Sequence, residues 1–328
     1  MKHLYKFIAL VFIFMIGIAF FSKSIPSISV STTTASSIQD STFPMVYLQV
    51  GESFINPLHG YSSELNSSTV RESITPLDTG KTFAVNIAEN DSKIKKLSYE
   101  LRDIANNKSI ETGDITAFDK NKKYKVATVH LKEAMDTSTE YGFCMTLITN
   151  YSKKIHFYTR IKYYDNDFFL SKKLDFVAKF HAATFDQGKS LDLSQYLESG
   201  TNDDSSYESV DIHSSRKLIT WGKLKPKKLT DVVPTVKELN IETAAISQTY
   251  FVSATTASGS ETYQVKEFYR VRYSGGRIYL LYFKRTMEAI FDPSLISINK
   301  SEVKIGISSA EDLDITSSDS NKKFAFVR

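Results

Sequence analysis

An unbroken apolar run near the start of the chain is the strongest constraint on how this sequence can fold. It extends from Phe7 to Phe21 and follows Lys2 and Lys6. Fifteen helical residues span roughly 22 Å, and Lys6 can extend its ammonium group toward a membrane surface, so the run approaches the roughly 30 Å core of a bilayer. A helix that is apolar on all sides rarely packs in a soluble domain. We therefore expect a membrane helix within residues 1–24. Its lipid-facing side chains would be Phe7, Ile8, Leu10, Val11, Phe12, Ile13, Phe14, Met15, Ile16, Ile18, Phe20 and Phe21.

Two interpretations of this segment remain open. A cleaved signal peptide fits the length of the run. An uncleaved signal anchor fits the poor cleavage site, because the best small-residue option is Ser22-Lys23-Ser24. Positive charge precedes the run, and after Lys23 the next basic residue is Arg71. The positive-inside rule then predicts a single-pass protein of the cell membrane with a cytoplasmic N-terminus and an extracytoplasmic body. The alternative is secretion after cleavage.

The overall composition limits the classes of partner and site. Lys+Arg number 41 and Asp+Glu 37, so the chain without Lys2 and Lys6 has 39 against 37. This near balance gives no reason to expect nucleic acid as a partner, because phosphate binding needs a concentrated positive field. The single cysteine, Cys144, excludes an intrachain disulfide and metal sites built from several cysteines.

Residues 25–42 are rich in serine and threonine and read as a flexible spacer. From residue 43 to 166 apolar and polar side chains alternate, as in Leu97, Tyr99 and Leu101, and turn signals separate the segments. Short strands with frequent turns predict a β-sandwich. The stretch from Leu131 to Phe143 resembles the E–F corner of fibronectin type III and immunoglobulin-like domains. That resemblance implies a structural role for Tyr141, whose hydroxyl would bond the corner backbone.

Residues 168–292 show a different period. Leu174, Val177, Ala178, His181 and Phe185 share one helical face, with Ser171 as the expected N-cap and a short second helix over 190–197. Long strands follow, and Gly275-Gly276 supplies a hairpin turn. This order resembles the NTF2-like α+β fold, which implies an antiparallel meander and a pocket between helix and curved sheet.

The final segment, residues 293–328, returns to alternation. Its end, from Ser318 to Arg328, resembles the opening strand of a TolB-type or WD40-like propeller repeat. A single propeller strand cannot bury its own faces. Either the protein continues into a propeller, or the tail completes a local sheet. The fold class expected is thus mainly β with α+β, and the combination resembles extracytoplasmic proteins of Gram-positive bacteria.

Few residues suggest chemistry. No His-Glu-x-x-His, Gly-x-Ser-x-Gly or phosphate-binding loop occurs, so we expect no metal, no cofactor and no enzyme of those classes. His181 lies on the apolar helical face, either as a core histidine or as a base in the pocket. Asp211 and His213 would share one face of a strand, either as a catalytic dyad or as solvated polar residues.

One basic cluster stands out between residues 216 and 228. Outside a bacterial membrane the available polyanions are teichoic acids and lipid headgroups, so the cluster predicts a surface contact with them or with another envelope protein. The alternative is a solvated loop balanced by upstream acids, with Trp221 in the core. The cluster consists of Arg216, Lys217, Trp221, Lys223, Lys225, Lys227 and Lys228.

These observations favour a non-catalytic, membrane-tethered binding or scaffold protein of the cell envelope. One alternative is an enzyme that uses the pocket of the α+β domain with a histidine base. Another is a structural stalk that presents a propeller beyond residue 328.

Overall fold

The computed structural model describes residues 43–66, 69–198, 206–256 and 259–290. It also describes isolated residues near the N-terminus and four short strands in residues 297–327. Residues 1–37 and 38–328 form separate compact units. Of the predicted membrane segment, Lys6, Val11, Phe14 and Met15 are described, as helical and exposed, and the rest lies outside the described residues, as does the spacer 25–42. Among the described residues no helix is both long and apolar enough to cross a bilayer.

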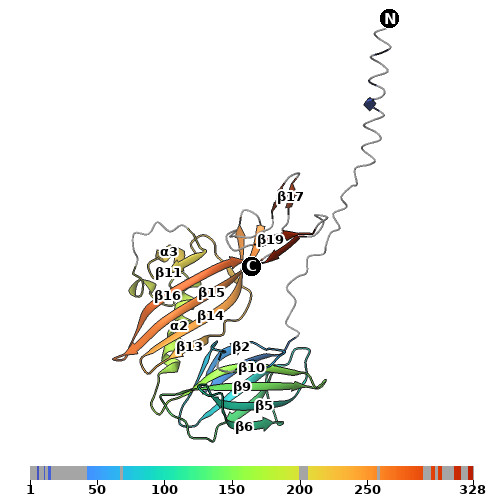
Figure 1. Cartoon of the computed structure of the whole chain (residues 1–328). Helices are drawn as coiled ribbons and strands as arrows, with labels where there is room; N and C mark the ends of the chain where they lie inside the picture. Colours follow the sequence, from blue (N-terminus) through green and yellow to red (C-terminus); the bar gives the residue numbers. More distant parts are fainter. Residues whose placement is uncertain are drawn as a thin grey trace. The chain divides into compact units, whose positions relative to one another are not determined.

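The chain is mainly β, and its first ten strands form two five-stranded sheets (Figure 1). One sheet has the order β2-β1-β4-β8-β7 and the other β3-β10-β9-β5-β6, in which β3 runs parallel to β10. The strands of the first sheet are β2 Ser53–Leu58, β1 Met45–Val50, β4 Thr82–Ala88, β8 Tyr124–His130 and β7 Asp119–Asn121. Those of the second are β3 Ile74–Leu77, β10 Lys154–Tyr163, β9 Glu140–Thr149, β5 Ile94–Asp103 and β6 Ser109–Ile115.

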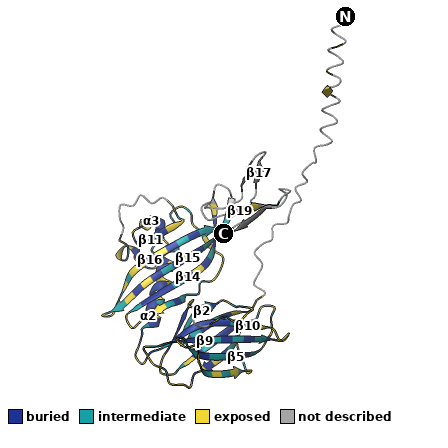
Figure 2. Ribbon diagram, in the orientation of Figure 1, coloured by how far each residue is buried: buried dark blue, intermediate teal, exposed yellow. Residues whose placement is uncertain are grey.

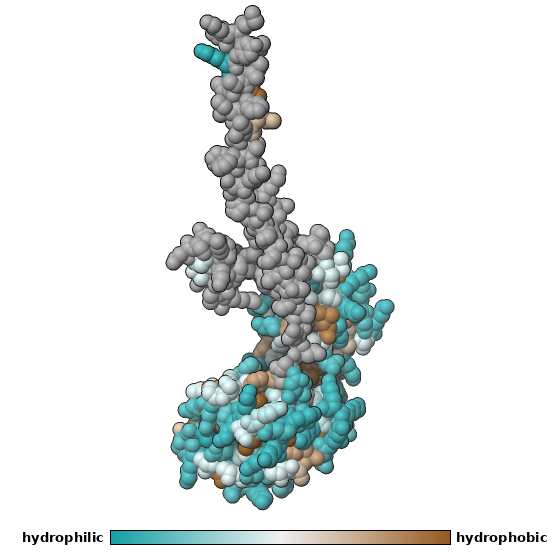
Figure 3. All heavy atoms as spheres, turned by 90° about the vertical axis from the view of Figure 1, so that its right-hand side faces the viewer, coloured by the Kyte–Doolittle hydropathy of each residue, from teal (hydrophilic) through white to brown (hydrophobic). Residues whose placement is uncertain are grey.

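Alternation along these strands explains why the two sheets stack. Leu48, Val85, Leu97 and Phe143 are fully buried, and their chain neighbours are more exposed in most strands (Figure 2). Apolar faces stacked in this way form the core of a sandwich. On the face shown in Figure 3 the sandwich is largely hydrophilic. At the turn into β9 the backbone N–H of Asp136 donates to Tyr141 Oη at 2.9 Å, the contact expected of a tyrosine corner.

A helix and a third sheet follow the sandwich. The helix α2 Leu170–Phe185 begins after Phe169, which is the N-cap, has φ 51° and makes no side-chain cap. The prediction of Ser171 as the N-cap is therefore wrong, because Ser171 lies inside the helix. The predicted second helix over 190–197 is wrong in length, because only the 3-10 turn η1 Leu193–Gln195 forms there. The sheet has the order β11-β16-β15-β14-β12, and β13 also pairs with β14. The bounds are β11 Ser209–Asp211, β16 Arg277–Ala289, β15 Gly259–Ser274, β14 Thr243–Thr256, β12 Lys227–Lys228 and β13 Thr235–Leu239.

The helix α2 packs on the inner face of this sheet because its apolar side chains recur every three to four residues. Phe176, Val177 and Phe180 are buried, and the Phe180 ring lies 5.0 Å from that of Phe283 and 5.7 Å from that of Tyr269. The space between helix and sheet is therefore occupied by aromatic side chains. The strands β15 and β16 join at Gly275 and Gly276, whose φ angles of 58° and 76° belong to the left-handed region that a tight hairpin requires.

The sandwich and this α+β lobe share one continuous apolar core. Buried polar groups also join them. Asn56 Nδ2 in β2 donates to the carbonyl of Ile74 at 2.8 Å, while Asn56 Oδ1 accepts from the backbone N–H of Val236 in β13 at 2.8 Å. Arg160 in β10 donates to Glu140 at 2.7 Å and to the carbonyl of Lys237 at 3.0 Å. The predicted boundary near residue 167 is thus a packed junction.

Lys173 on α2 ties the start of the α+β lobe to the turn between β13 and β14. Its buried ammonium group donates to the carbonyls of Phe168, Asn240 and Ile241 at 2.7–2.8 Å. Burial lowers the pKa of Lys173 to about 8.

The last strands form local hairpins. β17 Ser297–Asn299 pairs with β18 Glu302–Lys304, and β19 Asp314–Ser317 pairs with β20 Phe324–Val327. The segment that resembles a propeller strand thus pairs with a neighbouring strand of this chain.

Candidate functional site

The most unusual chemistry in the described residues is a carboxylate at the centre of the α+β lobe. Glu267 lies on the inner face of β15 and is 1% exposed. Its Oε1 accepts from Tyr250 Oη at 2.8 Å, and its Oε2 accepts from Tyr269 Oη at 2.7 Å. The same Oε2 lies 2.8 Å from His181 Nδ1 on α2. A buried carboxylate is tolerated only where such donors replace water.

The other nitrogen of His181 is also occupied. Its Nε2 lies 3.5 Å from Lys228 Nζ, and that ammonium group lies 4.9 Å from the centre of the Phe185 ring. Both ring nitrogens of His181 are thus engaged, Nδ1 by Glu267 and Nε2 by Lys228. Neither nitrogen then faces an open space in which a substrate proton could be taken.

Arg285 balances the charge of Glu267. The two residues lie directly opposite each other in the pairing of β15 with β16. Burial by itself would raise the pKa of Glu267, but His181, Arg285 and the Tyr269 hydroxyl outweigh it and lower that pKa below its ordinary value. Burial and the negative charge of Glu267 raise the pKa of Tyr250 and of Tyr269 well above 10.

Trp221 covers the other side of Arg285. The guanidinium carbon lies 3.4 Å from the centre of the indole ring, and Arg285 donates to the carbonyls of Ile219 and Leu218 at 2.8 and 2.9 Å. Trp221 is 1% exposed and has φ 64°. Trp221 thus lies in the core, as the alternative interpretation expected, and not among the exposed members of the basic cluster, because its indole packs on the flat guanidinium and beside the Phe185 ring, 5.5 Å away.

The six charged members of the predicted basic cluster are all exposed. They lie on α3 Arg216–Ile219, on β12 and on the loop between them. Arg216 donates to the carbonyl of Gln187 at 3.1 Å, and Lys228 reaches the His181 network. In the described part of the chain none of the six forms an ion pair with an acidic side chain. This segment therefore presents cations to the surroundings.

The predicted dyad of Asp211 and His213 does not form. The strand β11 ends at Asp211, and the chain turns so that the backbone N–H of His213 donates to Asp211 Oδ1 at 2.8 Å. The exposed His213 ring instead approaches Glu198, with Nδ1 3.3 Å from its carbonyl. Two residues that alternate in sequence share a face only while the strand continues.

Sequence reasoning found His181 but missed Glu267, Tyr250, Tyr269 and Arg285. A signal was present, because Glu267 stands among Val265, Tyr269 and Val271 at alternating positions that are otherwise apolar. Within the described residues no group of three or more His, Cys, Asp or Glu side chains is placed to hold a metal ion. No known protein-family model matches the chain, and no curated protein matches it.

Proposed function

We propose that this chain is a non-catalytic, membrane-tethered binding or scaffold protein of the cell envelope. The proposal treats the sandwich as an immunoglobulin or fibronectin-III-like module and the following lobe as an NTF2-like module. The parallel pairing of β3 with β10 and the Asp136–Tyr141 contact support the first assignment. The helix packed on an antiparallel meander supports the second.

The observation that carries the proposal is the junction between these modules. The side chain of Asn56 links β2 to both β3 and β13, and Arg160 links the second sandwich sheet to β13. Both side chains are buried. A buried polar group that loses its hydrogen-bond partner raises the free energy of the protein, so the two modules cannot separate freely. A rigid two-module body suits a protein that holds a partner at a set position.

The alternative of a pocket enzyme with a histidine base has less support. His181 engages both of its ring nitrogens, and aromatic side chains fill the space beside it. His213 lies on the surface without a paired carboxylate side chain in hydrogen-bond range, since Glu198 Oε2 lies 3.8 Å away.

The exposed basic residues 216–228 supply a binding mode for such a scaffold. Exposed cations attract teichoic acids or anionic headgroups, and attachment to the membrane would raise the local concentration of both. Envelope polyanions or another envelope protein are therefore the partners we propose.

Membrane fractionation of the full-length chain expressed in a bacterium tests the proposal. We expect the chain to remain with the membranes after an alkaline wash and to be digested by protease added outside protoplasts. A variant lacking residues 1–24 should be found in the soluble cytosolic fraction, and Val11→Lys should weaken insertion because a central lysine costs about 3 kcal/mol. Release by the wash, or protection from the protease, would refute the membrane-tethered arrangement.

A further inference from the structure

One side of the strand β16 in the third sheet is uncovered along half of its length. β16 lies between β15 and β11, but β11 pairs with it only from Lys284 to Thr286. From Arg277 to Tyr282 the strand has β15 on one side, and no described strand pairs with it on the other (Figure 1). A strand with a single neighbour presents unpaired N–H and C=O groups, to which another extended chain can bond.

Large apolar side chains are exposed on this same stretch. Tyr279, Leu281 and Tyr282 are 41–43% exposed, and no other four-residue stretch of the described strands exposes three large apolar side chains. The pairing with β15 skips Leu281, which makes it the extra residue of a β-bulge. The bulge explains why Leu281 and Tyr282 are both exposed, although consecutive, while Leu280 packs against the core. Exposed apolar side chains gathered in this way mark interaction surfaces.

Exposed cations surround these apolar side chains. Arg272 lies opposite Tyr279 in the pairing with β15, and its guanidinium carbon is 5.0 Å from the centre of the Tyr279 ring. Arg277 begins β16, and Lys284 follows the uncovered stretch. Within the described residues these three cations form no ion pair. Asp211 lies opposite Lys284 in β11 but accepts a backbone N–H of its own turn. A partner with acidic side chains would complement this surface.

The uncovered backbone decides which class of acidic partner fits. Its N–H and C=O groups recur at the spacing of an extended polypeptide, and lipid headgroups and teichoic acids have no matching series of donors and acceptors. A second copy of this chain would bring Arg272, Arg277 and Lys284 against the same three cations. Like charges that face each other across paired strands are destabilising. The surface therefore favours a different, acidic polypeptide.

From these observations we propose that an extended, acidic segment of a partner protein adds to the third sheet as a strand beside residues 277–282. Its backbone bonds to the uncovered side of β16, and its carboxylates pair with Arg272 and Arg277. Its apolar side chains pack against Tyr279 and Leu281. Strand addition here depends on the α+β lobe alone, so it would persist in a chain that is not attached to a membrane.

A synthetic peptide tests this strand addition. The probe is an acetylated and amidated peptide with the sequence Glu-Asp-Val-Tyr-Ile-Val-Asp-Glu, which has acidic ends and an apolar, β-branched centre. Full-length protein in a mild non-ionic detergent is titrated with it, and hydrogen exchange of the fragment that contains residues 277–282 is followed by mass spectrometry. We expect saturable protection of that fragment, because amides that gain hydrogen bonds exchange more slowly. Absence of protection overturns the proposal.

Two control peptides separate strand addition from attraction by charge. The first has the same sequence with N-methyl groups on its central Tyr and Ile, one of which must face β16 in an extended chain. It keeps the charge but loses a backbone donor, so it should bind about tenfold more weakly. The second has lysine in place of each acid and should not protect the fragment. Equal binding of either control contradicts the proposal. Protection without peptide that appears only at high protein concentration would identify a second copy as the occupant and would also contradict it.

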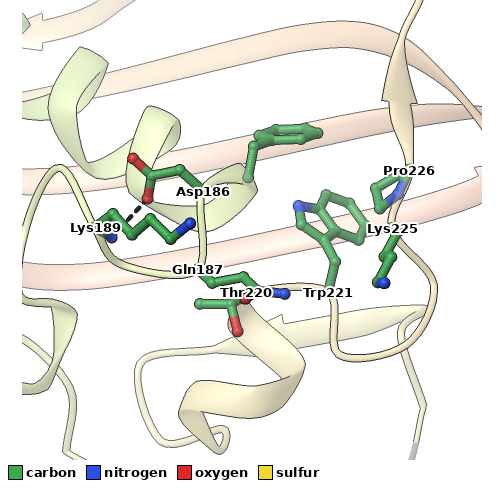
Figure 4. Close-up of a pocket in the computed structure, with 8 residues that line it drawn as sticks. Asp186, Gln187, Lys189, Thr220, Trp221, Lys225 and Pro226 are labelled. Atoms are coloured by element: carbon green, nitrogen blue, oxygen red, sulfur yellow. Dashed lines mark hydrogen bonds between the residues drawn. The ribbon is translucent and has the colours of Figure 1, made fainter.

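Variants of the protein locate the bound peptide. Arg277→Glu should weaken binding about tenfold, because repulsion replaces attraction at the start of the uncovered stretch. Lys225→Glu makes the same change of charge in the basic cluster, just before β12 at the opposite edge of the sheet (Figure 4), and should change binding less than about twofold. Tyr279→Ala should also weaken binding, whereas Tyr151→Ala, at an exposed tyrosine of the sandwich, should not. Equal effects within either pair of variants would place the peptide elsewhere and refute the proposal.

Discussion

The hydroxyl of Tyr250 offers the clearest test of the buried carboxylate network. In Tyr250→Phe the ring stays in place and keeps its edge contact with His181, whose centroid is 4.9 Å away. Only the 2.8 Å hydrogen bond to Glu267 Oε1 is lost. Both residues are 1% exposed, so water cannot replace the donor. A hydrogen bond to a buried charged group contributes about 1.5–3 kcal/mol, and we expect the free energy of unfolding to fall by that amount.

Urea unfolding of the full-length chain in detergent, followed by the fluorescence of Trp221, measures this loss. A loss of 1.5–3 kcal/mol corresponds to a Tm lower by about 2–4 °C in a protein of 328 residues, because the unfolding entropy is about 2.1 cal/mol/K per residue. Tyr151→Phe serves as the control, because Tyr151 is 83% exposed and its substitution should change stability by less than about 0.5 kcal/mol. If Tyr250→Phe at pH 7 matches this control, the network does not stabilise the lobe as described.

The same comparison has a defined pH dependence. The pKa of Glu267 is lower in the folded protein than its ordinary value of 4.5. A group with a lowered carboxyl pKa stabilises the folded state above its unfolded pKa, and that contribution is lost as the pH falls through the folded pKa. The difference between wild type and Tyr250→Phe should therefore be constant from pH 7 to about 5 and shrink in stronger acid. A difference that grows as the pH falls would contradict the ionised carboxylate.

Three further outcomes concern the junction, the buried Lys173 and the exposed lysines. Asn56→Ala leaves the backbone groups of Ile74 and Val236 unpaired, so we expect a loss of about 2–4 kcal/mol and two separate calorimetric transitions; one unchanged transition would contradict the rigid junction. Lys173 has a pKa of about 8 in the folded protein against 10.5 in the unfolded chain, so the unfolded chain holds more protons between pH 8 and 10 and the free energy of unfolding should rise with pH there. Urea midpoints should show this rise, and Lys173→Met should flatten it. An equal rise in both proteins would argue against Lys173 as its source. Replacing three cluster lysines with glutamine should weaken binding to phosphatidylglycerol vesicles about 100-fold, at roughly 1 kcal/mol for each lysine, whereas the same change at three exposed sandwich lysines should not; equal effects would rule out a specific surface. The cluster triple is Lys217, Lys223 and Lys227, and the control triple is Lys120, Lys122 and Lys123.

Much of the secondary structure was accessible from local patterns. Alternation at Leu97, Tyr99 and Leu101 predicted a strand, and β5 is found there. The helix over 170–185 followed from its three-to-four-residue period, although its first turn did not, because Phe169 rather than a serine ends the preceding turn. The Asp211–His213 prediction was wrong because alternation does not reveal where a strand stops.

By itself the sequence determined the features that depend on neighbours along the chain: the mainly β character, the helix, and the turn at Gly275 and Gly276. Periodicity and backbone stereochemistry are local properties, so they can be read without a fold. Only the tertiary structure decided that His181 meets Glu267, 86 residues away, and that Asn56 meets Val236, 180 residues away. Those contacts depend on strand register and on how the helix lies on the sheet. Both result from burying all the apolar faces together, and no short stretch of sequence specifies that outcome.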